Sequence, residues 1–557
     1  MSIQRRGPFD RLLGAGVEPE AQPSGGPDRA AIYVAGTILG LALLLLILLL
    51  PPVSVLSRGG GGSAASADST PGTASTIKAT PKRGMPKLPA GLVAASAYYA
   101  MAAPEDQRGA ARITVKLNEK PSDARSLGLY TYSDGTWQRL SDVTLVTVGG
   151  DTLGRGEVPA LPGNIAILRR SKAALEIAGF VPAGTVVDGR AAQALTTLQP
   201  IVYIPSADGG LTGDSPAVPP AAYRVVPCLI TLVPGVVEDL LRSTELTNAH
   251  VAAIAAKIRE GNYAGIAVDY RNISPALRKQ FTQFATQLHD ALAADGRTLT
   301  LVLPAPDLSS GEADEGAYDW EALGKVADTI ELVGEQDQEL YFQRTEAALK
   351  YITGRVDPSK ILITVNALSV ERGSDGLRPM SLASALSTAA SLSVKSPGDI
   401  TAGARVPLVA TNLADSEGAS GLHWDDAARA VTMSYTGAGG KRTLWFANAY
   451  SAAFRIELAQ RYKLGGIVVD DASEAGGGAD IWGVAQHAAD TGSVTLAKPN
   501  AELLTPAWTT ADGSLAPQTG TAVTWTAPTA AGSYTVTMIV SDGVVRAAQP
   551  VTLDVVP

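Results

Sequence analysis

The longest uninterrupted apolar stretch of the chain lies near its N-terminus. Residues 30–50 carry no charged side chain and end in a leucine-rich run, which is followed by Pro51-Pro52. At about 1.5 Å per residue, a helix of this length spans the roughly 30 Å hydrocarbon core of a bilayer. The pattern therefore predicts a transmembrane anchor at 30–56, preceded by a cytoplasmic tail at 1–29. A cleaved signal peptide is the alternative, but its apolar region is usually only about 7–15 residues long.

Basic residues are distributed unevenly around this apolar stretch. Arg5, Arg6, Arg11 and Arg29 precede it, whereas Arg58 is the nearest basic residue that follows it. Because basic residues beside a membrane helix favour the cytoplasmic side, this pattern predicts a cytoplasmic N-terminus. We therefore expect a single-pass cell-membrane protein with the bulk of its chain outside the cytoplasm.

Two segments follow before the main apolar pattern begins. Residues 57–90 are rich in Gly, Ser, Thr and Pro and lack apolar periodicity, which predicts a flexible linker. Residues 91–170 contain short alternating runs, among them Leu129–Tyr132 and Thr136–Leu140, which flank an Asp-Gly turn, and Asn164–Leu168. Alternation around such a turn predicts a β-hairpin, so we expect a small β-rich domain here.

Residues 171–490 alternate continuous apolar runs with helical periodicity, which is clearest at Ala249–Glu260 and Ala276–Ala294. Eight runs are typical of strands: Leu175–Val181, Leu198–Ile204, Tyr223–Thr231, Gly265–Arg271, Thr298–Pro304, Thr329–Gly334, Lys360–Leu368 and Gly465–Asp471. Strands that are apolar on both faces are typical of parallel sheets covered by helices. This stretch therefore predicts a closed (β/α)8 TIM barrel, with an open doubly wound sheet as the alternative. The long connection before the last strand predicts an inserted α+β lobe at about 372–445.

The C-terminal residues 494–557 return to period-two alternation. Thr521–Thr526 and Gly532–Gly543 are rich in Thr and Val, and turn residues lie between them. This pattern predicts a compact immunoglobulin-like β-sandwich.

Composition and charge exclude several classes of function. The net charge of −9 and the lack of a long basic stripe argue against nucleic acid as a partner. The single cysteine, Cys228, lies in an apolar run, which predicts a buried side chain and not a nucleophile. The four histidines, His250, His289, His423 and His487, have no metal-ligand spacing, so we expect neither a metal nor a cofactor.

A series of landmarks runs through the predicted barrel in a fixed order. They are Gly179–Pro182, Tyr318–Asp328, Val356–Leu362, Thr443–Tyr450 and Tyr462–Ile467. In type and order they resemble glycoside hydrolase family 18, the chitinase-like family, and in particular its branch of bacterial spore-cortex and peptidoglycan hydrolases. The resemblance implies a TIM barrel related to enzymes that act on polymers of N-acetylglucosamine.

The chemistry of that family lies on strand four, in the motif Asp-Gly-x-Asp-x-Asp-x-Glu. The matching positions here are Ala264, Ala267, Asp269 and Arg271, so two aspartates and the glutamate are replaced. The resemblance implies that the glutamate protonates the leaving oxygen while the acetamide of the sugar attacks. An arginine cannot do this, because its guanidinium stays protonated. Since alternate residues of a strand point the same way, we expect Asp269 and Arg271 to form an ion pair.

Two further elements of the family's site are altered in this chain. Val333–Gln336 stands where the family has Met-x-Tyr-Asp on strand six, and Val469–Asp471 where it has a tryptophan after strand eight. Carboxylates after these strands could supply a relocated acid, for which Glu335 and Asp470 are the candidates. The candidate binding residues are Asp269, Asp337, Asp471, Trp320 and Trp424. The two tryptophan rings either stack on a sugar or pack in a core, whereas we expect Trp445 and Trp482 to be core residues.

These observations lead to three hypotheses. The first is a membrane-anchored, catalytically inactive family 18-like barrel that binds an envelope glycan such as peptidoglycan, or a partner protein. The second is an active glycosidase on N-acetylglucosamine polymers with a relocated acid. The third is a structural subunit of a surface assembly, to which barrel and sandwich contribute only interfaces.

Overall fold

The computed structural model describes residues 65–68, 78–88, 92–103, 109–121, 127–148, 150–170, 175–231, 234–396, 398–414, 421–437 and 439–557. The predicted cytoplasmic tail and membrane anchor lie outside these residues. Within the described part of the chain, no helix is both long and apolar enough to cross a membrane.

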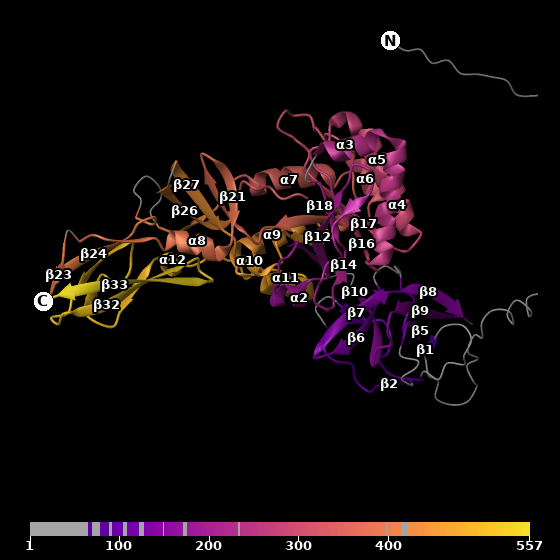
Figure 1. Ribbon diagram of the computed structural model, residues 1–557, viewed down its shortest axis with the longest axis horizontal. Coiled ribbons are helices and arrows are strands. Elements are labelled where there is room, and N and C mark those ends of the chain that lie inside the picture. The colour runs from indigo at the N-terminus through magenta and orange to yellow at the C-terminus, as the bar shows by residue number, and fades with distance from the viewer. Residues whose placement is uncertain are drawn as a thin grey trace, which may run out of the picture. The chain divides into compact units, whose positions relative to one another are not determined.

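Eight parallel strands close into a barrel (Figure 1). In chain order they are β11 (Glu176–Pro182), β12 (Thr197–Pro205), β15 (Cys228–Ile230), β16 (Gly265–Asp269), β17 (Thr298–Leu303), β18 (Thr329–Leu332), β19 (Ile361–Val365) and β28 (Gly466–Val469). Each strand pairs in parallel with the next, and β11 pairs with both β12 and β28, which closes the sheet. Two short strands, β13 (Leu211–Thr212) and β14 (Arg224–Val225), pair with β12. The predicted TIM barrel is confirmed.

Alternate residues along each barrel strand face either the helices or the lumen. On β16, Ile266 and Val268 belong to the large core beneath the helices, whereas Ala267 lies in a small separate cluster with Cys228. Both faces are buried, which explains why the strands are continuous apolar runs in the sequence. Burial also raises the pKa of the Cys228 thiol well above its usual value. This agrees with a packed side chain and not with a nucleophile.

Helices follow the strands and cover the outside of the barrel. They are α2 (Gly189–Ala194), α3 (Pro234–Arg242), α4 (Thr244–Glu260), α5 (Arg278–Ala293), α6 (Trp320–Val326), α7 (Tyr341–Ile352), α9 (Ala449–Arg461), α10 (Glu474–Gly477) and α11 (Ile481–Thr491). The predicted helices at Ala249–Glu260 and Ala276–Ala294 are confirmed within α4 and α5. Helix α4 begins directly after Ser243, whose side chain accepts a hydrogen bond from the backbone N–H of Leu246. This bond satisfies one of the free donors of the first turn.

The β-rich domain consists of two sheets, in the orders β1-β5-β9-β8 and β2-β4-β10-β6-β7, and β3 also pairs with β10. Its strands are β1 (Ala65–Asp68), β2 (Lys78–Pro81), β3 (Leu92–Ala94), β4 (Tyr99–Ala102), β5 (Ala111–Lys116), β6 (Leu127–Ser133), β7 (Thr136–Asp142), β8 (Thr144–Val148), β9 (Asp151–Val158) and β10 (Asn164–Arg170). The predicted hairpin is confirmed as β6 and β7. It turns at Asp134 and Gly135, both in the left-handed conformation that a two-residue hairpin turn of type I′ requires.

The first two strands of this domain fall inside the segment predicted as a flexible linker. That prediction is wrong for these residues, since β1 pairs with β5 and β2 pairs with β4. Both are short strands at the ends of their sheets. Backbone hydrogen bonds to one neighbour hold such a strand, so it needs none of the apolar alternation by which strands are recognised in a sequence.

The inserted lobe follows β19 and precedes α9. It contains α8 (Leu382–Ala389) and a five-stranded sheet in the order β21-β20-β27-β26-β25. These strands are β20 (Ser369–Gly373), β21 (Gly376–Met380), β25 (His423–Asp425), β26 (Ala430–Gly437) and β27 (Gly440–Phe446).

Two further sheets combine strands of the insertion with strands near the C-terminus. Their orders are β22-β24-β31-β30 and β23-β33-β32-β29. The strands are β22 (Leu392–Val394), β23 (Ile400–Thr401), β24 (Arg405–Ala410), β29 (Ala507–Thr510), β30 (Ser514–Ala516), β31 (Ala522–Thr526), β32 (Gly532–Ser541) and β33 (Arg546–Val556), and α12 (Ala501–Leu504) precedes β29. The strands expected at 494–557 are present, but residues 392–410 complete their sheets. One hydrophobic core runs through the lobe and both sheets.

The shared core leads to a prediction at Trp525. This residue of β31 is fully buried and lies opposite Val406 of β24. We expect Trp525→Ala to lower the free energy of unfolding by about 3–5 kcal/mol and to raise hydrogen exchange at 392–410 as well as in the C-terminal strands. Leu503→Ala, at an exposed position, should change stability by less than about 0.5 kcal/mol. Unchanged exchange at 392–410 in the tryptophan variant would contradict a shared core.

Candidate functional site

The C-terminal ends of the barrel strands form the mouth, where TIM-barrel proteins carry their functional residues. Of the four motif positions, Asp269 ends β16 and Arg271 follows it. Ala264 precedes this strand and Ala267 lies within it, and both belong to the buried apolar cluster around Cys228. The two alanines therefore fill space and offer no polar group to a ligand.

Asp269 and Arg271 form a two-pronged ion pair. Nε of Arg271 donates to Oδ1 of Asp269 at 2.6 Å, and Nη2 of Arg271 donates to Oδ2. The Asp269 side chain is 7% exposed, whereas that of Arg271 is 47% exposed. Hydrogen bonding to Asp269 raises the pKa of Arg271, so the guanidinium is a fixed cation. The predicted pair is confirmed, and it places a cation at the motif's glutamate position.

A partly exposed apolar floor adjoins this ion pair, and the sequence analysis missed it. Phe180 of β11, Ile201 of β12 and Ile230 of β15 pack against the lumen cluster and keep part of their surface exposed. Ile230 is the register partner of Asp269 on the neighbouring strand. The available signal was alternation along β11, since Phe180 lies two residues after Ala178 and on the same face of the strand.

Both candidate relocated acids already have partners. Oε2 of Glu335 accepts from Nη1 of Arg344 at 2.8 Å. Asp470 accepts from the backbone N–H of Ala367 at 2.6 Å and from Nδ2 of Asn366 at 3.0 Å. Burial nevertheless raises the pKa of Asp470 to about 6. This carboxyl, which is partly exposed, can therefore exchange a proton near neutral pH.

The loop between β18 and α7 is held by two more arginines. Arg372 of the inserted lobe donates to Asp337 at 3.0 Å and to Glu339 at 2.6 Å. Arg455 of α9 is buried and donates to Oε1 of Gln338 in the same loop. The candidate binding residue Asp337 thus fastens the loop to the lobe. Its carboxylate is committed to Arg372 in this arrangement.

The segment after β28 is a tight backbone turn. Asp471 is buried, and its Oδ1 accepts the backbone N–H of Ser473 at 2.8 Å. The N–H of Ala472 donates to the carbonyl of Phe180 at 2.7 Å, which ties the end of β28 to the end of β11. Asp471 is therefore placed as a turn residue, and its candidate role in binding stays a prediction.

The two candidate tryptophans differ in their surroundings. Trp320, the first residue of α6, is 0% exposed and lies in the core between helices and barrel. Of the two roles considered for this ring, core packing is confirmed and stacking on a sugar is wrong. Trp424 of β25 is half-buried, and its ring lies 5.6 Å from that of Phe454 on α9. Part of Trp424 stays accessible. Trp445 and Trp482 are buried, as expected.

A carboxyl that the sequence analysis missed lies on the lumen side of β18. Glu331 is 1% exposed, its Oε1 accepts from Nε2 of Gln199 at 2.6 Å, and its Oε2 has no partner among the described residues. Burial raises the pKa of Glu331 to about 8. At neutral pH this side chain is therefore mainly an uncharged carboxylic acid. A single glutamate within an apolar run gives no sequence pattern that shows whether its side chain faces the lumen or the surface.

Metal ligation finds no support in the described part of the chain. No group of three or more His, Cys, Asp or Glu side chains there is placed to hold a metal ion. His250 of α4 is buried, with Nε2 2.6 Å from the hydroxyl of Tyr270, and burial lowers its pKa. It is a packed, neutral ring.

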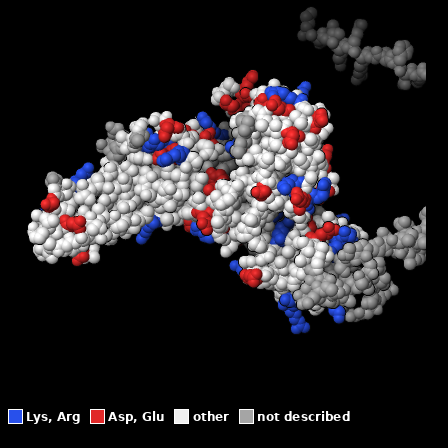
Figure 2. All heavy atoms as spheres, viewed as in Figure 1, with Lys and Arg blue, Asp and Glu red and all other residues white. Residues whose placement is uncertain are grey.

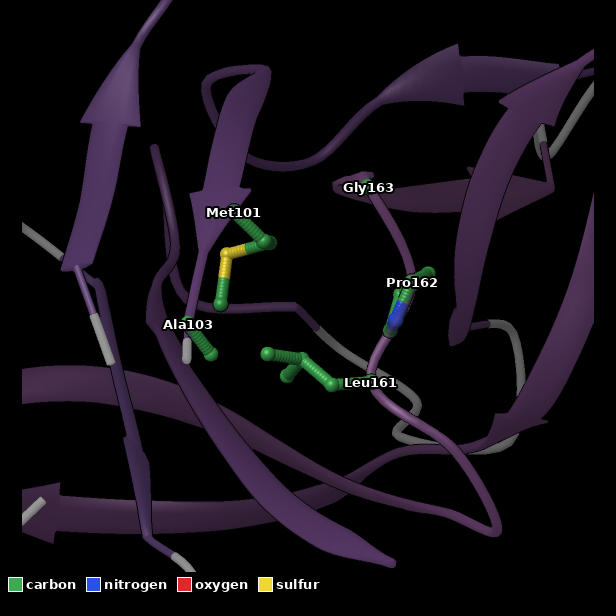
Figure 3. Close-up of a pocket in the computed structure, with 5 residues that line it drawn as sticks. All are labelled: Met101, Ala103, Leu161, Pro162 and Gly163. Atoms are coloured by element: carbon green, nitrogen blue, oxygen red, sulfur yellow. The ribbon is translucent and has the colours of Figure 1, made fainter. Parts of the chain in front are cut away.

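The charged side chains on one face and a hollow in the β-rich domain give no sign of a further ligand site. Figure 2 shows acidic and basic side chains intermingled on the face in view. A hollow of about 130 Å³ in the β-rich domain is lined by Met101, Ala103, Leu161, Pro162 and Gly163 (Figure 3). These five residues carry no titratable side chain and no side-chain hydrogen-bond donor.

No protein-family model and no curated protein matches the chain. Among solved structures, it is similar to a chitinase from Chromobacterium violaceum at 19% identity and a TM-score of 0.45, over 57% of this chain and 99% of that one. It is also similar to the spore cortex-lytic enzyme SleL of Bacillus cereus, at 16% identity and a TM-score of 0.45, over 64% of this chain and 79% of that one. SleL of Bacillus megaterium matches at 17% identity and a TM-score of 0.43, over 59% and 78% of the two chains. At these values the similarities do not assign the chain a family or an activity.

The buried acid of the lumen predicts a pH-dependent stability. An unfolded glutamate ionises near its ordinary pKa of 4.5, whereas folded Glu331 keeps its proton up to about pH 8. Between these values the unfolded chain binds fewer protons, so stability falls as pH rises, by up to about 1.4 kcal/mol per pH unit. We expect Glu331→Gln to remove this fall, because a glutamine side chain does not titrate. Its amide oxygen can still accept the hydrogen bond from Gln199.

Chemical unfolding measured from pH 4.5 to 8.5 tests this expectation. The stability difference between Glu331→Gln and the unmodified protein should grow steadily with pH and level off above about 8. Glu312→Gln removes an exposed carboxylate and serves as the matched control. Parallel curves for all three proteins would contradict the assignment of Glu331 as a buried neutral acid.

The ion pair at the mouth predicts an asymmetry between its two partners. Arg271→Met leaves the buried Asp269 carboxylate unpaired, which we expect to cost about 3 kcal/mol of unfolding free energy. Asp269→Asn leaves a guanidinium that is half exposed and hydrated, so the cost should be about 1 kcal/mol or less. Urea unfolding of both variants at pH 7 measures the difference. Equal costs, or the reverse order, would contradict the burial of Asp269 as the controlling factor.

Proposed function

We propose that this protein is a catalytically inactive barrel, displayed outside the cytoplasm, that binds N-acetylglucosamine-containing envelope polymer at its mouth. The observation that carries the proposal is the ion pair between Asp269 and Arg271. A glycosidase with two carboxyl groups needs one acid that can protonate the leaving oxygen. At this position the chain has instead a guanidinium that stays charged and is fixed by its partner.

The other carboxylates at the strand ends also argue against catalysis. Glu335 is paired with Arg344, and Asp337 is paired with Arg372. A general acid works best with a pKa near the working pH and within reach of the proton it transfers. A carboxylate that is already bonded to an arginine is not available to protonate a ligand oxygen.

The apolar floor supports a role in binding. Aromatic rings offer a flat, weakly polar face, and Phe180 is partly exposed in the same cluster as Ile201 and Ile230. Next to this floor, Arg271 uses Nε and Nη2 for Asp269 and keeps Nη1 as a donor for a ligand oxygen. A sugar with an acetamido group offers both an apolar face and a carbonyl acceptor. Sugar recognition needs only these contacts and no proton transfer.

A second function remains open because of one specific observation. Asp470 has a pKa near 6 and is partly exposed at the mouth, which suits a general acid. An active glycosidase with Asp470 as relocated acid is therefore the alternative proposal. Glu335, the other candidate, is less suited because its carboxylate is already paired with Arg344.

One experiment on the full-length chain in detergent separates these proposals. Retention on insoluble chitin and on peptidoglycan is measured together with release of soluble sugar. We expect retention without release, and we expect Phe180→Ala to weaken retention by about tenfold, the loss of roughly 1–1.5 kcal/mol of stacking. Leu377→Ala, an exposed position on β21, is the matched control and should bind normally.

The other outcomes each identify a different function. Sugar release that Asp470→Asn abolishes would show a working glycosidase. No retention on either polymer would refute the glycan proposal and leave the structural subunit. Display outside the cytoplasm is tested separately, by protease access to the chain in intact cells.

A further inference from the structure

A carboxyl and an amide meet where strands seven and eight of the barrel end. Val365 and Val469 are register partners, so Asn366 and Asp470 follow as neighbours. Nδ2 of Asn366 donates to Oδ2 of Asp470 at 3.0 Å, and the backbone N–H of Ala367 donates to Oδ1 at 2.6 Å. These two contacts fix which oxygen of the carboxyl faces which donor.

The amide of this pair is incompletely bonded. Asn366 is 2% exposed, and its Oδ1 has no hydrogen-bond partner among the described residues. Leaving a buried acceptor unpaired is unfavourable. An amide can turn over and exchange its donor and acceptor ends, whereas the backbone N–H of Ala367 cannot.

The groups around Asp470 determine its charge state. Burial, the largest cause, raises the pKa of Asp470 to about 6, like-charge repulsion from the next residue, Asp471, also raises it, and Arg455 of α9 lowers it. Tyr341 of α7 also interacts with Asp470, and its own pKa, raised by burial to about 12, keeps the phenol neutral. Arg455 stays charged throughout. Asp470 is partly exposed, so protons reach it from solvent.

We propose that Asn366 and Asp470 form a proton-operated latch at the mouth of the barrel. With the carboxyl ionised, Nδ2 of Asn366 donates to Oδ2 and Oδ1 of the amide stays unpaired. Ala367 requires Oδ1 of Asp470 to remain an acceptor, so an incoming proton settles on Oδ2. The amide then turns over, the N–H to Oδ2 bond is broken, and the new O–H of Asp470 donates to the amide oxygen.

The latch is connected to the candidate binding floor through the backbone. The N–H of Asp470 donates to the carbonyl of Val365, and two residues later the N–H of Ala472 donates to the carbonyl of Phe180. The segment that carries Asp470 therefore adjoins the strand end that carries the aromatic ring. The latch itself does not depend on the proposed function, because it is tested without a ligand.

The test is an NMR titration of the full-length chain in detergent, with ¹³C-carboxyl aspartate and ¹⁵N-labelled asparagine side chains. We expect one aspartate carboxyl to titrate near pH 6 and to be missing in Asp470→Asn. The side-chain amide signals of Asn366 should move with the same midpoint. Asp471→Asn, the neighbouring carboxyl, is the matched control and should keep the Asn366 transition, with its midpoint moved to lower pH.

A second variant distinguishes a latch from a simple hydrogen bond. If Asn366 only donates to the carboxylate, Asn366→Ser should raise the Asp470 midpoint by about one pH unit or more, because the ionised form alone loses a bond. In a latch both protonation states lose a bond, so the midpoint should move by less than about half a unit. Three results would each overturn the proposal: a rise of the Asp470 midpoint by about one pH unit or more in Asn366→Ser, an Asp470 midpoint below about pH 5 in the unmodified protein, or Asn366 signals that do not change during the titration.

Discussion

A closed barrel of eight strands must fill its lumen with every second side chain, and polar groups placed there have to find partners inside. This constraint governs the whole centre of the protein. Asp269 is buried, and its charge is tolerable because Arg271 reaches back from two residues further on. Also in the lumen, Glu331 accepts a hydrogen bond from the amide of Gln199, its one hydrogen-bond partner among the described residues. Its side chain is mainly uncharged at neutral pH. One carboxyl is paired and the other is neutralised, and both solutions satisfy the same requirement.

The same requirement shapes what the mouth can do. The ion pair commits the carboxylate of Asp269 to Arg271, whereas a catalytic acid has to be free to give a proton to the substrate. Arginines from α7, the lobe and α9 hold the loop after β18 in a comparable way. What stays available to a ligand includes apolar surface, one guanidinium edge and the partly exposed carboxyl of Asp470. These groups suit recognition, which requires complementary contacts but no proton transfer.

The barrel could be predicted from the sequence because its signal is local. Each strand is a short apolar run, and the pair Asp269–Arg271 follows from the two-residue period of a single strand. The partner of Asp337 could not be predicted, since Arg372 comes from the lobe and lies beside this carboxylate only after folding. Trp320 was ambiguous because one ring at the start of a helix gives no direction. A position in the sequence fixes a residue's neighbours along the chain but not across the core.

The two sheets β22-β24-β31-β30 and β23-β33-β32-β29 are divided between residues 392–410 and 507–556, again through pairings that form only on folding. The chain leaves the barrel after β19, builds the lobe and part of both sheets, and returns through α9 and β28 before it completes them. At the start of α9, buried Asn448 donates to Asp542 of the C-terminal strands at 3.1 Å.

Seven residues further along the same helix, Arg455 holds Gln338 in the mouth loop. A single helix thus carries contacts to the C-terminal strands and to the mouth. Catalytic loops generally need freedom to open and close, whereas recognition benefits from a surface that is already ordered. A mouth loop held through α9 to the C-terminal strands therefore supports the proposed role in binding a ligand over a role in turnover.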